Sequence, residues 1–303
     1  MPDWPNHIID IMSNDVCVAL AYRTPAGGVV LTPVTTVGMH DPAAGTVTVT
    51  SSLGNWKKLV RMREDDRVAI VYHARDHSGI EHPQLLVAQG RASFPDKADG
   101  NWLTPEAAAR QDHFLPAHPK GRFLGWVTRE YYDHRVPITI AVERIIVDGA
   151  DQPAAGPVST PPAKGTSARV KPKKYLKRWK NAKHFLLGYV DVDGFPTAHR
   201  ITPQIDGGDI RFRDVRLPEG GRRAGLLAHW FEPKLVGQGS VLMTGWLEVH
   251  DGEGKFSPHT AGGYAMPPKE LAYHLAGGLA SKFGYRSALK KGLVRNGEWQ
   301  QPA

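Results

Sequence analysis

Apolar and polar residues alternate along several short stretches of the chain, a period typical of β-strands with one buried face. In the first half this pattern, together with short apolar runs such as VCVALAY at 16–22, predicts strands at residues 16–22, 28–34, 46–50, 67–73, 84–94 and 136–147. In the second half it predicts strands at 184–191, 196–203, 208–213, 224–231 and 240–249. Turn signals every ~8–12 residues indicate antiparallel barrels or sandwiches, because parallel strands would need long helical crossovers.

Helices are predicted as well. A short one fits residues 104–111, where Thr104 can cap the amino end and Pro105 can occupy the first helical position. A longer one fits residues 268–283 near the carboxyl end. Its apolar residues recur every four positions and share one face, which we expect to be part of the core: Leu271, Leu275, Leu279 and Phe283.

The two halves of the chain show similar segments in the same order. LTPV at 31–34 matches ITPQ at 201–204, and VAQGRA at 87–92 matches MTGWLE at 243–248, with Gly90 against Gly245. This order suggests duplication of one β unit, with chance similarity between β-rich segments as the alternative. A stretch rich in Pro, Ala, Gly and Ser separates the halves, so we expect a first domain at 1–148, a linker at 149–173 and a second domain at 174–303 that includes the C-terminal helix.

Composition indicates a globular chain, with 41% hydrophobic and 22% charged residues among 303. The single cysteine, Cys17, excludes an internal disulfide and favours a reducing compartment. We find no signal peptide and no apolar run near the ~20 residues that a membrane helix needs, so we expect a cytoplasmic protein without a membrane partner.

The formal net charge is +8, and much of it lies in residues 164–183, which contain no acid. The favoured interpretation of this run is a solvated linker leading into a basic helix. A nucleic-acid patch and a surface that attracts an acidic ligand are the alternatives.

Residues 46–73 carry the strongest candidate chemistry. A strand ends in Thr50, Ser51 and Ser52, a small turn with Gly54 and Asn55 follows, and a short helix then opens with Lys57 and Lys58. Backbone N–H groups, hydroxyls and ammonium groups that converge at a helix N-terminus are suited to holding a phosphate. The alternative is an ordinary amphipathic helix, with Trp56 and its apolar neighbours buried and the lysines solvated.

Other common sites are not indicated. The chain lacks the GxSxG, GxxxxGK[ST] and HExxH patterns. Its fourteen histidines are scattered along the sequence, so we expect no metal site.

With these motifs in order, the sequence resembles the flavin-binding split barrel of pyridoxamine 5'-phosphate oxidase and its flavin and deazaflavin oxidoreductase relatives. The resemblance extends over residues 16–94 and rests on five segments: Thr32-Pro33-Val34, Thr50-Ser51-Ser52, Lys57 with Lys58, Asp66-Arg67-Val68-Ala69-Ile70, and Ala88-Gln89-Gly90-Arg91-Ala92. It implies a mainly β fold of two tandem six-stranded antiparallel split barrels that form a pseudo-dimer, so that the chain is a monomer or a homodimer.

The resemblance further implies that FMN or the 5-deazaflavin coenzyme (F-420) lies in a groove between the barrels. The cofactor-binding residues would be Thr32, Pro33, Val34, Thr50, Ser51, Ser52, Asn55, Trp56, Lys57, Lys58 and Gln89. Candidates from the second barrel are His199, Arg200, His229 and Trp230, for which a core or surface position is the alternative.

The implied function is an oxidoreductase that transfers a hydride to or from a small organic substrate. We name no catalytic residue, because that chemistry belongs to the cofactor. The C-terminal substrate clamp of the oxidase cannot be placed, so oxidation of vitamin B6 is not implied. The second half lacks the Ser-Ser and Lys-Lys pairs, which suggests one working site. The alternative is a non-catalytic protein that binds a flavin, a deazaflavin or haem.

Overall fold

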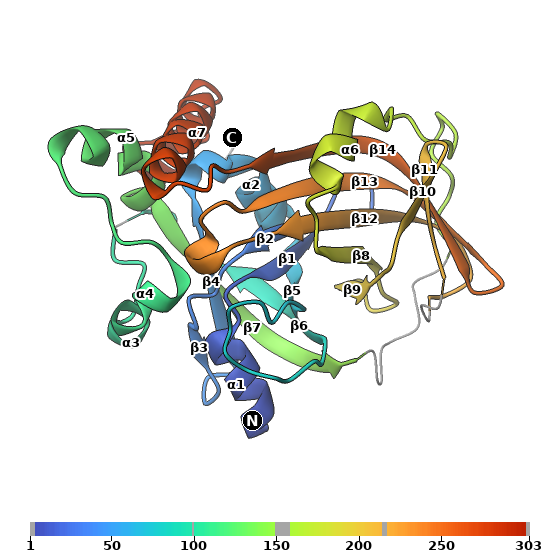
Figure 1. Cartoon of the computed structure of the whole chain (residues 1–303), viewed down its shortest axis with the longest axis horizontal. Helices are drawn as coiled ribbons and strands as arrows, with labels where there is room; N and C mark the ends of the chain where they lie inside the picture. Colours follow the sequence, from blue (N-terminus) through green and yellow to red (C-terminus); the bar gives the residue numbers. More distant parts are fainter. Residues whose placement is uncertain (1–3, 99, 149–157, 214–216, 301–303) are drawn as a thin grey trace.

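The computed structural model describes residues 4–98, 100–148, 158–213 and 217–300 (Figure 1). Most of this part of the chain belongs to two antiparallel sheets, each with seven strands. The prediction of a mainly β chain with two tandem antiparallel barrels is therefore confirmed. Each sheet has seven strands where the resemblance implied six. The sequence pattern missed the edge strands β3 (His40–Asp41) and β10 (Gln204–Asp206), which are too short to show alternation, and in the second half it also missed β14 (Glu253–Ala265).

Barrel one is the sheet formed by residues 18–147. Its strand order is β2 (Val29–Val34), β1 (Val18–Arg23), β5 (Arg67–Tyr72), β6 (Leu86–Ser93), β7 (Arg135–Val147), β4 (Thr46–Ser52) and β3. Its helices are α1 (Asn6–Asn14), η1 (Leu53–Asn55), α2 (Trp56–Glu64), α3 (Pro105–Ala109), α4 (Gln111–Phe114) and α5 (Arg122–Tyr132).

Barrel two is the sheet formed by residues 184–265. Its strand order is β10, β11 (Asp209–Phe212), β14 (Glu253–Ala265), β13 (Gly239–His250), β12 (Gly220–Trp230), β8 (His184–Val190) and β9 (Pro196–Arg200). Its helices are α6 (Lys173–Trp179) and η2 (Pro233–Leu235). In the reverse direction this order is β9-β8-β12-β13-β14-β11-β10. It repeats the order β2-β1-β5-β6-β7-β4-β3 of barrel one, strand for strand.

The bulges of the two sheets support the duplication. The register of β6 shifts between Gln89 and Gly90, and that of β13 shifts between Thr244 and Gly245. At each shift a Cβ on the glycine would collide with a backbone carbonyl of the next strand, Ala141 in one barrel and Ser257 in the other. The predicted match of Gly90 with Gly245 therefore has a physical cause, because only glycine fits at both bulges.

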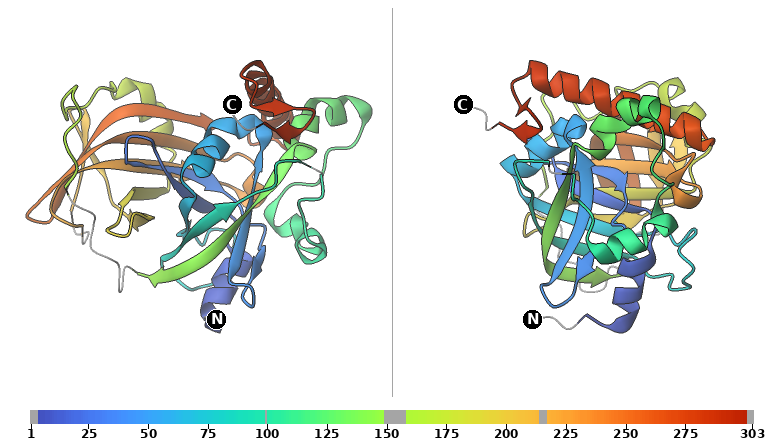
Figure 2. Two further views of the ribbon diagram at one scale, coloured as in Figure 1. Left: turned by 180° about the vertical axis from the view of Figure 1, so that it is seen from behind. Right: turned by 90° about the vertical axis from the view of Figure 1, so that its left-hand side faces the viewer.

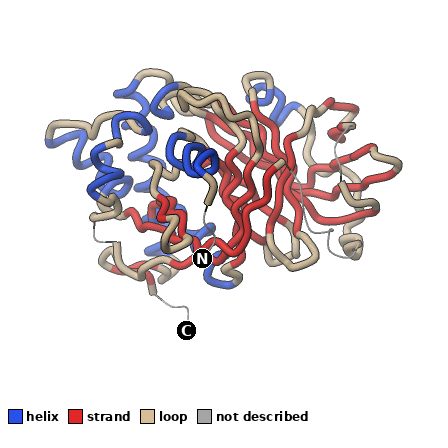
Figure 3. Tube along the Cα trace, turned by 90° about the horizontal axis from the view of Figure 1, so that it is seen from below, coloured by secondary structure: helices blue, strands red, loops and turns tan. Residues whose placement is uncertain are grey.

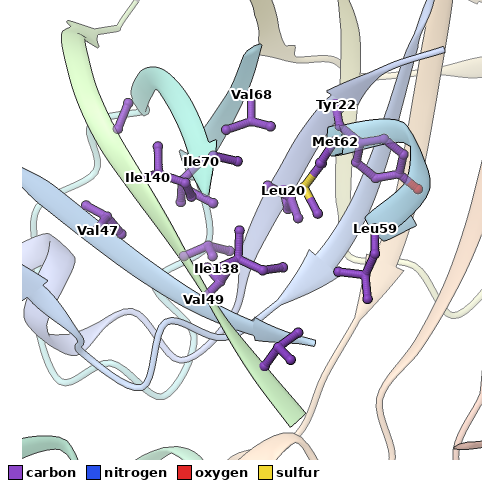
Figure 4. Packing of buried hydrophobic residues seen from close by; sticks show 14 of the residues in the cluster. Leu20, Tyr22, Val47, Val49, Leu59, Met62, Val68, Ile70, Ile138 and Ile140 are labelled. Atoms are coloured by element: carbon purple, nitrogen blue, oxygen red, sulfur yellow. The ribbon is translucent and has the colours of Figure 1, made fainter. Parts of the chain in front are cut away.

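Each barrel has its own core, and a third apolar layer joins them. The core of barrel one packs alternating side chains of β1, β4, β5 and β7 against Leu59 and Met62 of α2 (Figure 4). Between the barrels, Leu31 and Val71 belong to one buried cluster with Leu186 and Leu227. Figure 3 shows the strands of both sheets running together through the molecule, with most helices gathered at one end.

The C-terminal segment returns to barrel one. Helix α7 (Glu270–Lys290) lies against α5 and η1, and the hairpin β15 (Val294–Arg295) and β16 (Glu298–Trp299) follows it (Figure 2). Tyr285, Ala288, Val294 and Trp299 are buried in the core of barrel one. The helix was predicted within the second domain, but its buried contacts are with the first.

The buried face of α7 differs from the predicted one. Tyr273, Gly278, Lys282 and Tyr285 are buried, whereas Leu271, Leu279 and Phe283 of the predicted apolar stripe are exposed to solvent. The expectation that this stripe belongs to the core is therefore wrong. The physical reason is that close packing on η1 and α5 selects the side of the helix that carries the small residues.

The predicted short helix is split into α3 and α4. Thr104 caps α3, because its hydroxyl accepts a hydrogen bond from the Ala107 N–H at 3.2 Å. The predicted linker falls partly on residues 149–157, outside the described ranges. In the described residues, no helix has the length and apolar character that crossing a bilayer requires.

Candidate functional site

A cavity of about 550 Å³ lies between the two barrels, at the end where β4 turns into α2. Barrel one provides the ends of β2 and β4, the start of α2, and residues of α5 and β7. Barrel two provides side chains from the loop after β12 and from the end of β14, and one side of α7 closes the wall. The volume is in the range of pockets that bind small molecules and cofactors.

Most of the residues predicted from sequence line this cavity. They are Thr32, Pro33, Val34, Thr50, Ser51, Ser52, Asn55, Trp56, Lys57 and Lys58. The fold therefore brings the end of β2 together with the Thr-Ser-Ser turn and the paired lysines. Their role in binding a cofactor stays a prediction.

Gln89 lies elsewhere, in a polar contact between the barrels. Its side-chain amide donates hydrogen bonds to Asp191 at 2.8 Å and to the Pro196 carbonyl at 2.9 Å. Its carbonyl oxygen accepts from Arg144, which also binds Asp191. All polar atoms of Gln89 thus have protein partners, and it joins the barrels instead of facing the cavity.

Ser52 and Gly54 shape the turn at the mouth of the cavity. The Ser52 hydroxyl accepts from the Gly54 N–H at 3.1 Å, which caps η1, and donates to the Glu130 carbonyl at 2.9 Å. A Cβ on Gly54 would lie 2.6 Å from the Ser281 carbonyl oxygen of α7. The small, hydroxyl-rich turn is therefore required first by the close approach of α7.

Arg135 is the main residue of the site that sequence analysis missed. It starts β7 directly opposite Ser52 and is buried. Its Nε and Nη2 donate to the Thr50 hydroxyl at 3.1 and 2.7 Å, and its guanidinium group lies 4.8 Å from the Tyr131 ring centre. Within the described ranges it forms no ion pair with a carboxylate.

Lys58 is the second cation of the cavity. It is half-buried, and in the described part of the chain it also has no carboxylate partner. Burial, followed by repulsion from Arg135, lowers the pKa of Lys58 to about 8. Two like charges held together without a counter-ion favour binding of an anion, since an anion would restore the protonated state of the lysine.

Three tyrosines also line the cavity: Tyr131, Tyr264 and Tyr273. Burial raises the pKa of Tyr131, but the Arg135 charge and hydrogen bonds to Tyr273 and Arg135 outweigh it, so the net pKa is lowered. Burial raises the pKa of Tyr273 and of Tyr264, and the Tyr264 hydroxyl donates to Gln238 at 3.2 Å. This wall provides flat apolar surface with polar edges, which suits an aromatic ligand.

The sequence candidates from barrel two do not line this cavity. His229 is fully buried, and its Nε2 lies 2.6 Å from Nε2 of His73. Because His73 Nδ1 donates to the Val71 carbonyl at 3.0 Å, His229 is the donor between the two rings. His199 forms a hydrogen bond with the Tyr189 hydroxyl, and Arg200 donates a hydrogen bond to the His73 carbonyl. Trp230 is likewise buried and outside the cavity wall.

A larger cavity of about 950 Å³ in barrel two carries different electrostatics. Three of its four Lys and Arg residues have acidic partners, Arg211 with Asp206, Arg213 with Glu253 and Lys183 with Glu232, and the fourth, Arg200, donates to backbone carbonyls. Within the described residues, a pair of cations without carboxylate partners, Lys58 and Arg135, thus distinguishes the cavity between the barrels.

The basic run of residues 164–183 is partly structural. Helix α6 buries Tyr175 and Trp179 in the core of barrel two and leaves its lysines on the outside. None of the run lines the cavity between the barrels. Its placement agrees with the favoured interpretation of a basic helix that follows a linker.

No protein-family model matches the chain, and no curated protein shows significant sequence similarity to it. Among solved structures, a conserved hypothetical protein from Mycobacterium tuberculosis is similar at 17% identity over 54% of this chain and 94% of that one, with a TM-score of 0.33. A pyridoxamine 5'-phosphate oxidase-related, FMN-binding protein from Nostoc punctiforme matches at 10% identity over 67% and 98%, also at 0.33. An F-420 reductase matches at 16% identity over 48% and 98%, at 0.32.

The last two descriptions match the kind of protein that the sequence resembles. TM-scores near 0.3 are too low, however, for the likeness to say anything about the site or the activity of this chain.

Proposed function

We propose that this chain is an oxidoreductase that binds a flavin-type cofactor, FMN or the 5-deazaflavin coenzyme, in the cavity between its barrels. The observation that carries the proposal is the unbalanced pair of cations, Arg135 and Lys58, on the wall of that cavity. A flavin-type cofactor combines a phosphate with a flat aromatic ring, and the cavity is lined by both cations and aromatic side chains.

The residues present fit such a cofactor. Lys58 and Arg135 would hold its phosphate, with the Thr50 hydroxyl keeping the guanidinium group in place. Trp56, Tyr264 and Tyr273 would pack against its ring, and the seal between α7 and η1 would exclude water. When bound, the cofactor supplies hydride transfer. The chain itself needs only to bind the cofactor, orient its ring and shield the ring from water.

The mouth of the cavity favours a ligand with further negative charge. The ammonium groups of Lys57 and Lys291 lie 5.6 and 5.4 Å from the Trp56 ring centre, and Lys57 is exposed. These cations are placed to meet an acidic tail that extends from the cavity, which supports the 5-deazaflavin coenzyme over FMN. A small organic substrate would complete the reaction.

The experiment compares two ligands that differ only in the phosphate, FMN and riboflavin, and adds the deazaflavin coenzyme as a third. Binding of FMN, of the deazaflavin coenzyme and of riboflavin is measured by fluorescence titration for the parent and for Lys58→Gln. Loss of one charge-assisted contact is worth about 1.5–3 kcal/mol, so the affinity for FMN should fall roughly 10- to 100-fold. Riboflavin, which lacks the phosphate, should bind both proteins equally. Lys177→Gln on α6 is the matched control and should change nothing.

Two outcomes would contradict the proposal. An equal loss for riboflavin would mean that Lys58 supports the shape of the cavity and not a phosphate. No binding of any of the three ligands by the parent would refute the cofactor assignment. Binding without turnover of quinone, nitro or enone acceptors would instead identify a non-catalytic binding protein.

A further inference from the structure

Exposed apolar side chains are concentrated on two neighbouring helices. Of the eight large hydrophobic residues exposed in the described ranges, six lie on α5 and α7: Phe123, Trp126, Leu271, Leu279, Phe283 and Leu289. Phe123 and Phe283 are 67% and 65% exposed. Single exposed apolar residues are normal on a protein surface, but a cluster of this kind marks a place of interaction.

The two helices that carry these residues pack directly against each other. A Cβ on Gly278 of α7 would lie 2.6 Å from the Val127 carbonyl of α5, so the helices are in close contact. The Lys282 ammonium group lies 3.4 Å from the Trp126 ring centre and bridges them. Figures 1 and 2 show α5 and α7 side by side at one end of the molecule. We call Phe123, Trp126, Leu279 and Phe283 the α5/α7 patch.

Positive charge surrounds the α5/α7 patch. Residues 120–133 and 270–291 together contain seven Lys and Arg but only three Asp and Glu. Two of those acids are already close to cations: Glu130 lies 3.9 Å from Lys282, and Asp133 lies 3.8 Å from Arg129. Arg286 and Lys290 stay exposed beside the apolar residues.

This combination selects one kind of partner. A second copy of the chain bound through the same patch would place this cationic surface against itself, which like charges oppose. Aromatic and leucine side chains flanked by Lys and Arg are instead typical of surfaces that lie in the headgroup region of an anionic bilayer. We propose that the α5/α7 patch docks on the surface of an anionic lipid membrane, without any segment crossing it.

The experiment is flotation with vesicles of two compositions. The parent should float with vesicles of equal parts phosphatidylcholine and phosphatidylglycerol, float poorly with phosphatidylcholine alone, and bind less as salt rises. Trp126→Ser with Phe283→Ser should lose most of the binding. Arg286→Glu with Lys290→Glu should weaken it by about fivefold or more per cation removed. Val192→Ser, at an apolar site of barrel two that is 55% exposed, is the matched control.

Either of two results would overturn the proposal. One is the absence of binding to the anionic vesicles by a parent protein whose circular dichroism shows that it is folded. The other is a parent that light scattering shows to be a dimer and that Trp126→Ser with Phe283→Ser converts to a monomer, because a second copy would then cover the patch. Cofactor affinity should be unchanged in all of these variants, since none of the substituted residues lines the cavity.

Discussion

At the scale of single residues, the notable group is a lysine that is poised to lose its proton near neutral pH. Lys58 has a pKa of about 8 because its ammonium group is partly removed from water and is repelled by Arg135. A lysine in water would stay charged up to pH ~10. The anion affinity of the cavity should therefore depend on pH in a range where surface lysines do not titrate.

This dependence can be measured directly. From pH 7 to 9.5 the affinity for FMN should fall as Lys58 loses its charge, by up to about tenfold per pH unit above its pKa. A bound phosphate stabilises the ammonium form, so the fall should be centred somewhat above pH 8. Lys58→Arg should abolish the dependence, because arginine stays protonated throughout. An equally steep dependence in Lys58→Arg would contradict the assignment.

Some residues of the site could be predicted from the sequence and others could not. Lys57, Lys58 and the Thr-Ser-Ser turn stand next to each other in the chain, so local spacing was enough to find them. Arg135 was missed because it meets the turn only through the pairing of β4 with β7, which places it opposite Ser52. The predicted strand at 136–147 began one residue after it, and a charged residue at a strand start gives no local signal of a site.

At the scale of elements, the contact between η1 and α7 holds the cavity together. Gly54 permits this contact, because a side chain there would meet the backbone of Ser281. Backbone cannot move aside as the end of a flexible side chain can. The helix would have to shift, and with it one wall of the cavity.

Gly54→Ala should therefore lower the free energy of unfolding by about 1–3 kcal/mol, the usual cost of overpacking. It should also weaken cofactor binding. Gly125→Ala is the matched control, since no atom lies within 4 Å of the added Cβ in α5. The free energy of unfolding of that variant should be unchanged or about 1 kcal/mol higher, because alanine favours helix. Urea denaturation measures the free energy of unfolding of both variants. An equal change in Gly54→Ala and Gly125→Ala would contradict the packing argument.

Strands were predictable where short apolar runs lie between turn signals. All six strands predicted in the first half are present, although β1 and β5 are buried on both faces, one in the core of barrel one and the other in the layer between the barrels. Strand β14 was missed, since Gly254, Pro258 and Gly262 interrupt its pattern. Helix α5 was missed as well. The exposed stripe of α7 was misassigned because spacing shows which residues share a face, but not which face is buried.

At the scale of the whole molecule, the barrels are joined through a buried pair of neutral histidines. Burial, followed by repulsion from His184, lowers the pKa of His229 to about 3, and burial with repulsion from His229 lowers the pKa of His73 well below its usual value. In the unfolded chain both would titrate near 6.5. Below that pH the unfolded state binds protons that the folded state resists, so stability is lost as pH falls.

His229→Asn should remove part of this loss. As the pH falls from 6.5 to 5, each of the two histidines should lower the free energy of unfolding of the parent by up to about 1.4 kcal/mol per pH unit. The free energy of unfolding of the variant should fall less. Other buried groups also titrate, since burial raises the pKa of Asp15 to about 8 against the attraction of Arg75. The test therefore compares the slopes of unfolding free energy against pH. His250→Gln, at an exposed site, should keep the parental slope; identical slopes for all three proteins would refute the role of the pair.

The return of α7 and Trp299 to barrel one also governs the order in which the molecule can be completed during synthesis. Barrel two can close around its own strands as they leave the ribosome. Barrel one cannot, because Tyr285, Ala288 and Trp299 of its core follow barrel two in the chain and are synthesised after it. Until α7 packs against barrel one, Leu53 and Leu59 are more exposed. The nascent chain then presents apolar surface to chaperones. The wall that α7 gives the cavity is therefore added only after both barrels have been synthesised, so a ligand can be enclosed only from that point on.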